Sequence, residues 1–73
     1  MKLARVIRNA EGVWQLIRPS GSVRKPPRGT IVQYEYEVGN EVFRVYFPGV
    51  QGYAPMDCGI FWGYFKELDD ETS

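Results

Sequence analysis

Two runs of β-branched and aromatic residues, 30–38 and 41–47, flank the dipeptide Gly39-Asn40. This arrangement predicts a β-hairpin, and a glycine at the first position of a two-residue loop suits a type II′ turn. Because loop length fixes the register, the cross-strand pairs follow from it. Glu35 then faces Arg44 on a side that we expect to be wet. The opposite side collects the residues expected in the core: Val32, Tyr34, Tyr36, Phe43, Val45 and Phe47.

A second hairpin is predicted earlier in the chain. Residues 9–12 have asparagine at the first and glycine at the fourth position of a type I turn. Strands over residues 2–8 and 13–18 would flank this turn. Apolar side chains project from both of their faces, which suits a strongly curved sheet or a small barrel. Residues 19–29 and 48–55, rich in proline and glycine, are expected to be loops.

Residues 56–68 carry two competing patterns. Their apolar residues recur at helical spacing, and Pro55 with Asp57 resembles a helix start. However, Gly59 and Gly63 would each cost a helix interior about 1 kcal/mol relative to alanine, and acidic residues would crowd its C-terminal end. We therefore expect a closing strand over residues 58–66, with a helix over residues 56–68 as the alternative. Residues 69–73 are expected to form a frayed tail.

These elements predict one mainly β domain over residues 1–73. We expect a small five-stranded, strongly bent sheet or an SH3-like barrel, built from two hairpins and a closing strand. The alternative is an α+β fold, in which a four-stranded antiparallel sheet is followed by the C-terminal helix. The order of elements resembles that of SH3-like small barrels in layout only, since no sequence motif carries the resemblance. Eleven aromatic residues supply the buried area that so short a chain needs.

Composition narrows the class of protein. Cys58 is the only cysteine, so no intramolecular disulfide is possible and a reducing cytoplasm fits best. The start of the chain lacks a signal-like apolar core, and no apolar run reaches the roughly 18 residues of a membrane span. We therefore expect a soluble protein without a membrane partner. The net charge is zero, but residues 1–30 hold seven basic and one acidic side chain, whereas residues 31–73 hold two basic and eight acidic ones.

Signals for catalysis are weak. The chain has no histidine, which removes the commonest general base and metal ligand. The carboxylate of Asp57 beside Cys58 would raise the pKa of the thiol, the wrong direction for a nucleophile. No glycine-rich phosphate-binding motif is present. We expect a protein that is not an enzyme and needs no cofactor or metal.

Two segments instead suggest binding. Residues 53–65 hold more large apolar groups than one strand can bury on a single face. Some of them should form an exposed surface for a protein partner or for self-association; the alternative is a helix or closed barrel that buries them all. The candidates are Tyr53, Met56, Phe61, Trp62 and Tyr64. Our first hypothesis is therefore a small protein-binding module, such as an inhibitor or accessory subunit.

The second hypothesis is a nucleic-acid-binding small barrel. Basic residues on the first hairpin and in the proline-rich loop could form one face, beside an aromatic ring that stacks on a base. The candidates are Arg5, Arg8, Trp14, Arg24, Lys25 and Arg28. Alternatively, Trp14 belongs to the core and the basic residues are ordinary surface charge, since the overall neutrality of the chain opposes strong binding of polyanions.

Overall fold

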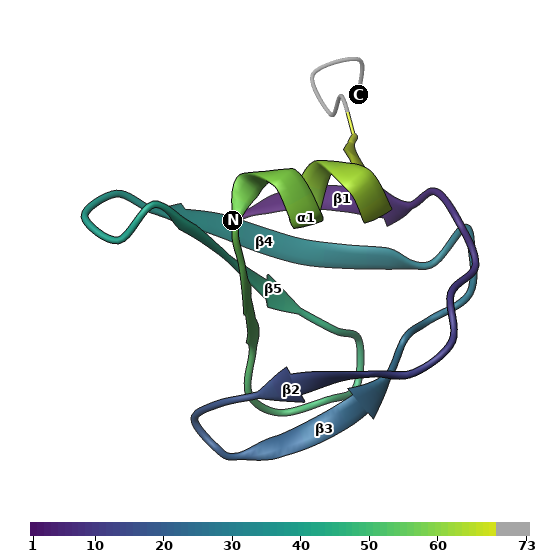
Figure 1. Ribbon diagram of the computed structural model, residues 1–73, viewed down its shortest axis with the longest axis horizontal. Helices are drawn as coiled ribbons and strands as arrows, with labels where there is room; N and C mark the ends of the chain where they lie inside the picture. Colours follow the sequence, from purple (N-terminus) through teal and green to yellow (C-terminus); the bar gives the residue numbers. More distant parts are fainter. Residues whose placement is uncertain (69–73) are drawn as a thin grey trace.

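The structure is a computed structural model that describes residues 1–68, so the predicted tail over residues 69–73 lies outside the described residues. Within these residues, seven strands and one short helix follow one another (Figure 1). They are β1 (Lys2–Val6), β2 (Val13–Leu16), β3 (Gly21–Arg24), β4 (Ile31–Glu37), β5 (Val42–Tyr46), β6 (Ala54–Met56), α1 (Cys58–Tyr64) and β7 (Phe65–Glu67).

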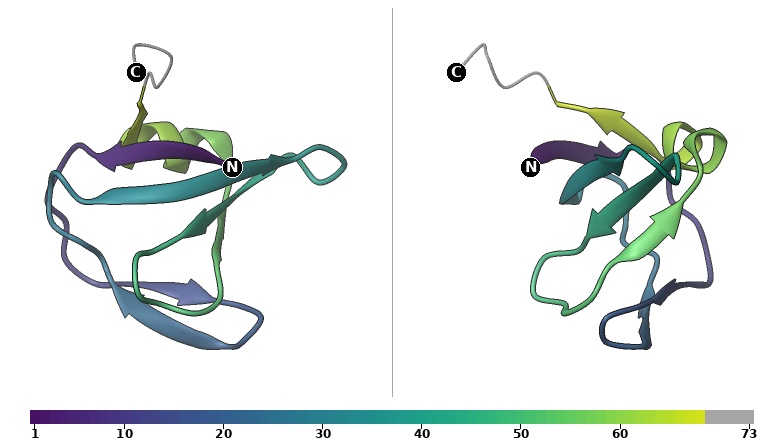
Figure 2. Two further views of the ribbon diagram at one scale, coloured as in Figure 1. Left: turned by 180° about the vertical axis from the view of Figure 1, so that it is seen from behind. Right: turned by 90° about the vertical axis from the view of Figure 1, so that its left-hand side faces the viewer.

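Five strands form an antiparallel main sheet in the order β6-β5-β4-β1-β7, and β2 pairs with β3 in a separate two-stranded ribbon. The main sheet is strongly bent, with α1 and the β2–β3 ribbon at opposite sides of the structure (Figures 1 and 2). The prediction of a mainly β domain with a five-stranded bent sheet is confirmed. Among the described strands no barrel closes, since β6 and β7 remain the edges of the main sheet.

The hairpin of β4 and β5 has the predicted register. Tyr34 pairs with Val45, Glu35 with Arg44, and Tyr36 with Phe43. The predicted two-residue turn is wrong: the loop has four residues, 38–41, in which the backbone N–H of Glu41 donates to the carbonyl of Glu37 at 2.9 Å. Both Gly39 and Glu41 adopt positive φ there. This loop keeps the register because it adds one residue to each side of Gly39-Asn40.

The predicted first hairpin is wrong. β1 pairs with β4 and β7, while β2 pairs with β3, inside the segment expected to be a loop. Ala4 and Val6 explain the choice, because both are buried and a central strand of the main sheet buries them on its inner face. Asn9 is also used elsewhere, since its side-chain oxygen accepts from the backbone N–H of Arg28 at 2.8 Å. Long-range pairing therefore overrides the local turn signal.

Residues 56–68 contain both predicted alternatives in succession. The Asp57 carboxylate accepts from the backbone N–H of Ile60 at 2.8 Å and caps α1. The expected strand over residues 58–66 is thus wrong for its first part, and the helix is shorter than the alternative proposed. Phe65 then leaves the helix in extended conformation and opens β7, which pairs with β1.

One hydrophobic core fills the space between the main sheet, the ribbon and α1. Phe61 is fully buried and stacks on Phe43 at 4.3 Å and on Phe65 at 5.0 Å between ring centroids. The remaining members come from every layer: Ala4, Val6, Leu16, Val32, Tyr34, Val45, Phe47, Ala54 and Met56.

Gly52 allows the ribbon to close against β6. The backbones of Ile17 and Tyr53 exchange two hydrogen bonds, of 2.9 and 3.1 Å. Gly52 has a φ of +86°, and a Cβ there would lie 2.9 Å from the carbonyl oxygens of Ile17 and Pro19. Glycine is therefore required at this position for both its backbone conformation and its size.

Candidate functional site

The five aromatic and apolar candidates for protein binding do not form one surface. Met56 and Phe61 are buried because β6 and one side of α1 face the core, whereas Tyr53, just before β6, is buried against Tyr46 and Arg44. Tyr64 is half-buried, and only Trp62 is largely exposed, at 45%. The expectation that residues 53–65 expose several of these side chains together is thus corrected: three of the five are buried, and α1 buries Phe61 while it turns Trp62 outward.

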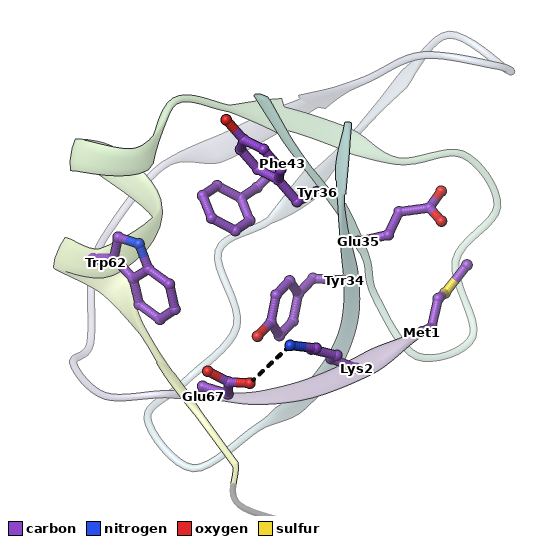
Figure 3. Close-up of a pocket in the computed structure, with 8 residues that line it drawn as sticks. All are labelled: Met1, Lys2, Tyr34, Glu35, Tyr36, Phe43, Trp62 and Glu67. Atoms are coloured by element: carbon purple, nitrogen blue, oxygen red, sulfur yellow. Dashed lines mark ion pairs between the residues drawn. The ribbon is translucent and has the colours of Figure 1, made fainter. Parts of the chain in front are cut away.

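Trp62 instead borders a pocket that the sequence did not predict. The pocket lies between α1, the β4–β5 hairpin and the start of β1, and has a volume of about 460 Å³ (Figure 3). We call it the aromatic pocket. Its lining comprises Met1, Lys2, Tyr34, Glu35, Tyr36, Phe43, Trp62 and Glu67.

Aromatic rings make the walls of the aromatic pocket. Phe43 meets the ring of Tyr36 at 5.1 Å and that of Trp62, edge to face, at 5.5 Å between centroids. Tyr34 lies deeper, 5.8 Å from Phe43, and is buried. Tyr36, by contrast, is 47% exposed, which corrects its expected place in the core.

The exposure of Tyr36 follows from the length of the hairpin. Tyr34, Tyr36 and Phe43 share the inner face of the main sheet, as the alternation predicted. β4 extends to Glu37, however, and Tyr36 lies at this end of the strand, where no further core side chain covers its outer side. The sequence signal for this exposure is the position of Tyr36, only two residues before the turn, whereas alternation alone places its side chain in the core.

An ion pair closes the lower edge of the aromatic pocket. The ammonium of Lys2 lies 3.5 Å from a carboxylate oxygen of Glu67, with side chains 70% and 45% exposed (Figure 3). The Tyr34 hydroxyl points toward this pair, and its burial, followed by the Glu67 charge, raises the pKa of Tyr34 to about 12. So exposed a pair contributes little to stability, and its partners are easily separated.

A second polar network covers the outer face of the same hairpin. The Arg44 guanidinium donates to Glu37 at 2.8 Å and lies 3.9 Å from Glu35. The Tyr46 hydroxyl donates to Glu35 at 3.0 Å. The predicted pair of Glu35 and Arg44 is therefore present, but Glu37 is the closer partner. The hydrogen bond from Arg44 lowers the pKa of Glu37.

The elements that line the aromatic pocket carry an excess of negative charge. Five carboxylates lie on them or at their ends: Glu35, Glu37, Glu41, Asp57 and Glu67. Four cations lie on the same elements: Lys2 and Arg44 in ion pairs, and Arg5 and Lys66 side by side on β1 and β7. Most of the negative charge lies on the β4–β5 hairpin, where Glu35, Glu37 and Glu41 are accompanied by one cation, Arg44, so this hairpin forms the acidic end of the fold.

Two of the basic candidates gather with Trp14 around Tyr64. The Lys25 ammonium lies 4.5 Å above the ring of Trp14, and the Arg8 guanidinium lies 4.2 Å above that of Tyr64. The rings of Trp14 and Tyr64 meet edge to face at 5.1 Å. Arg8, followed by Lys25, lowers the pKa of the Tyr64 hydroxyl. Trp14 is half-buried against the core, which partly agrees with the alternative that Trp14 belongs to the core.

The remaining basic candidates separate. Arg24 pairs across the ribbon with Val13, and both are exposed, on the opposite side from the core-facing pair of Trp14 and Val23. Arg5 and Arg28 line a second pocket together with Lys66. Lys66 was missed because it is distant in sequence, and only the pairing of β7 with β1 brings it beside Arg5.

Comparisons with protein-family models, with curated proteins and with solved structures found no match for this chain. Function must therefore be argued from the sites themselves. Within residues 1–68 no group of three or more metal-ligating side chains lies together, and no helix there has the length and apolar character to cross a membrane. Cys58 is a free, exposed thiol at the start of α1.

Proposed function

We propose that this chain is a non-enzymatic binding module, and that its aromatic pocket holds a cationic side chain of an extended segment of a partner protein. The observation that carries the proposal is the pair of exposed rings, Trp62 and Tyr36, at the mouth of a pocket on the acidic end. Exposed tryptophan and tyrosine are the side chains that most often dominate the energy of a protein interface.

The shape and charge of the aromatic pocket favour a cation over an uncharged apolar group. A cation above the face of an aromatic ring gains about 0.5–1 kcal/mol at an exposed site and about 2 kcal/mol when desolvated. Trp62, Tyr36 and Phe43 offer three rings from three elements, α1, β4 and β5, within one pocket. The surrounding carboxylates add long-range attraction for a basic segment.

Lys2 is the natural competitor of such a ligand. Its ammonium already forms an ion pair with the Glu67 carboxylate at the pocket edge. A cation from a partner would displace Lys2 from Glu67, and the exposure of both side chains keeps the cost of this exchange low. Removing the charge of Lys2 is therefore expected to strengthen binding of a cationic ligand, whereas removing that of Glu67 is expected to weaken it.

A peptide series tests the proposal. Blocked nonapeptides of one sequence, with a central lysine, arginine, trimethyl-lysine, leucine or glutamate, are titrated by calorimetry. We expect the three cationic peptides to bind at least fivefold more tightly than the leucine peptide, and the glutamate peptide to bind weakest. Trp62→Ala should lower the affinity about tenfold, equivalent to 1.4 kcal/mol. Val13→Ala is the matched control, because Val13 is 49% exposed on the ribbon, outside the pocket.

Two charge variants complete the test. Lys2→Gln should raise the affinity for the lysine peptide about threefold, and Glu67→Gln should lower it by a similar factor. Equal binding of the leucine and lysine peptides would refute a cation site. An unchanged affinity of Trp62→Ala for the lysine peptide would refute the aromatic pocket as the binding site.

Self-association through the same pocket is the competing outcome. Sedimentation of the wild-type chain and of Trp62→Ala distinguishes it: a concentration-dependent dimer that the substitution abolishes would mean that the exposed rings bind a second copy. The proposal expects monomers in both cases. The exposed thiol of Cys58 fits a module that works in the reducing cytoplasm.

A further inference from the structure

We propose that the second pocket, between β1, β7 and the loop before β4, binds phosphate groups in the backbone of a nucleic acid. We call this feature the basic pocket. It is distinct from the aromatic pocket and does not depend on the function proposed above. Its volume is about 670 Å³, and its lining comprises Arg5, Val6, Ile7, Asn9, Arg28, Gly29 and Lys66.

The main sheet places two like charges side by side in the basic pocket. Arg5 of β1 is the direct cross-strand partner of Lys66 of β7. Like charges in this position destabilise a sheet, so their pairing calls for an anion between them. The opposite neighbour of Arg5, Ile31 on β4, provides no countercharge.

Backbone contacts bring the third cation to the same place. The N–H of Gly29 donates to the carbonyl of Val6 at 2.8 Å, and the N–H of Arg28 donates to the side chain of Asn9 at 2.8 Å. These bonds fix the loop against the end of β1. The backbone positions of the three cations are therefore held by the fold before any ligand arrives.

Within residues 1–68, no carboxylate pairs with these three cations. The ion pairs of that part of the chain involve only Lys2 and Arg44 as cations. The segments that form the basic pocket contribute Glu67 as a carboxylate, and it pairs with Lys2. A phosphate oxygen would supply the missing hydrogen-bond acceptor, because the planar guanidinium of arginine can donate two hydrogen bonds to a phosphate.

The neighbouring aromatic residues indicate how the nucleic acid would be recognised. Arg8 follows Ile7 of the basic pocket and lies over Tyr64, while Lys25 lies over Trp14. Because these cations already cover the two rings, the rings position the cations and do not stack on bases. Positive charge therefore extends beyond the basic pocket, but no free aromatic ring accompanies it. We infer that binding is independent of base sequence.

Fluorescence anisotropy with labelled twelve-nucleotide strands tests this inference. We expect oligo-dT and oligo-dA to bind with equal affinity at 50 mM salt. Three neutralised phosphates give a slope of log K against log salt of about −2, since each contributes about −0.7 on a single strand. The affinity should therefore fall roughly tenfold to twentyfold between 50 and 200 mM salt.

Single substitutions locate the site. Arg28→Gln and Lys66→Gln should each weaken binding severalfold and make the salt slope less negative by about 0.7. Arg24→Gln is the matched control, because Arg24 is an exposed cation on the ribbon outside both pockets. All three side chains are exposed, so thermal unfolding should be unchanged.

Three results would overturn the inference. The first is no oligonucleotide binding at 50 mM salt. The second is an Arg24→Gln effect as large as that of Lys66→Gln, which would mean diffuse attraction by net surface charge. The third is full displacement of the oligonucleotide by 5 mM inorganic phosphate at constant ionic strength, which would identify a site for free phosphate instead.

Discussion

The orientation of α1 can be tested by comparing two neighbouring aromatic residues. Phe61 is fully buried and contacts the rings of Phe43, Phe65 and Tyr34, whereas the next residue, Trp62, is 45% exposed. This difference places the aromatic pocket outside the core. Replacing each residue by alanine should therefore affect folding very differently.

The magnitudes follow from burial. Phe61→Ala removes a completely buried ring and leaves a cavity, which costs about 3–5 kcal/mol. A domain of 73 residues has roughly 4–11 kcal/mol of stability in total, so this variant should be close to unfolding. Trp62→Ala leaves no cavity and loses only part of the transfer energy of its ring, about 1–2 kcal/mol. Phe61→Leu, at about 2 kcal/mol, keeps a folded variant available for measurement.

Urea unfolding followed by circular dichroism measures all three values. The expected order of destabilisation is Phe61→Ala, then Phe61→Leu, then Trp62→Ala. A loss for Trp62→Ala that equals the loss for Phe61→Ala would refute the reasoning, since it would make Trp62 a core residue. A loss for Phe61→Ala below about 1 kcal/mol would refute it as well.

Three further predictions concern backbone and ionisation. Gly52→Ala should lower the free energy of unfolding by at least about 2 kcal/mol, because Gly52 has a positive φ and a Cβ there would lie 2.9 Å from two carbonyl oxygens. Gly63→Ala, at a helical position with open space around it, should raise the free energy of unfolding by up to about 1 kcal/mol. Urea unfolding of both variants measures these changes. In an ultraviolet titration Tyr64 should ionise before the other tyrosines and Tyr34 among the last, near pH 12, and Tyr64→Phe and Tyr34→Phe should remove the first and a late step. The lowered pKa of Glu37 adds stability above the unfolded-state pKa that is lost as the pH falls through the folded-state value, so Glu37→Gln should reduce the loss of stability between pH 6 and pH 3; an unchanged loss would contradict it.

The sequence predicted those parts of the fold that depend on local patterns. Alternation and loop position gave the register of β4 and β5, including the neighbours Glu35 and Arg44. Asp57 predicted where the helix begins, in the alternative that places a helix in residues 56–68. These features depend on residues within a few positions of one another, where geometry leaves few choices.

Pairing between distant segments could not be predicted in the same way. The turn signal at residues 9–12 was a plausible local solution, but burial of Ala4 and Val6 required a central strand with two partners. β3, with only one apolar residue, carries no strand signal of its own and forms by pairing with β2. The candidate sites could not be fully predicted for the same reason, since Lys66 lies beside Arg5 only because β7 pairs with β1.

The aromatic pocket shows why residue types alone misplace a site. The clustered aromatic residues of the C-terminal segment indicated a surface there, yet three of the five candidates are buried, two of them in the core. The exposed rings are Trp62 and a hairpin tyrosine, Tyr36, that alternation had assigned to the interior. Alternation identifies the face of a sheet, but the length of the covering elements decides how much of that face is buried.

The two tryptophans provide the most direct test of a module with two separate binding sites. Each gives one indole N–H signal in a proton–nitrogen correlation spectrum, assignable with Trp14→Phe and Trp62→Phe. The lysine peptide should shift the Trp62 signal and leave that of Trp14 in place. The oligonucleotide should leave the Trp62 signal unchanged, because the basic pocket shares no lining residue with the aromatic pocket. A Trp62 signal that no cationic peptide moves would contradict the central claim that the aromatic pocket binds a partner.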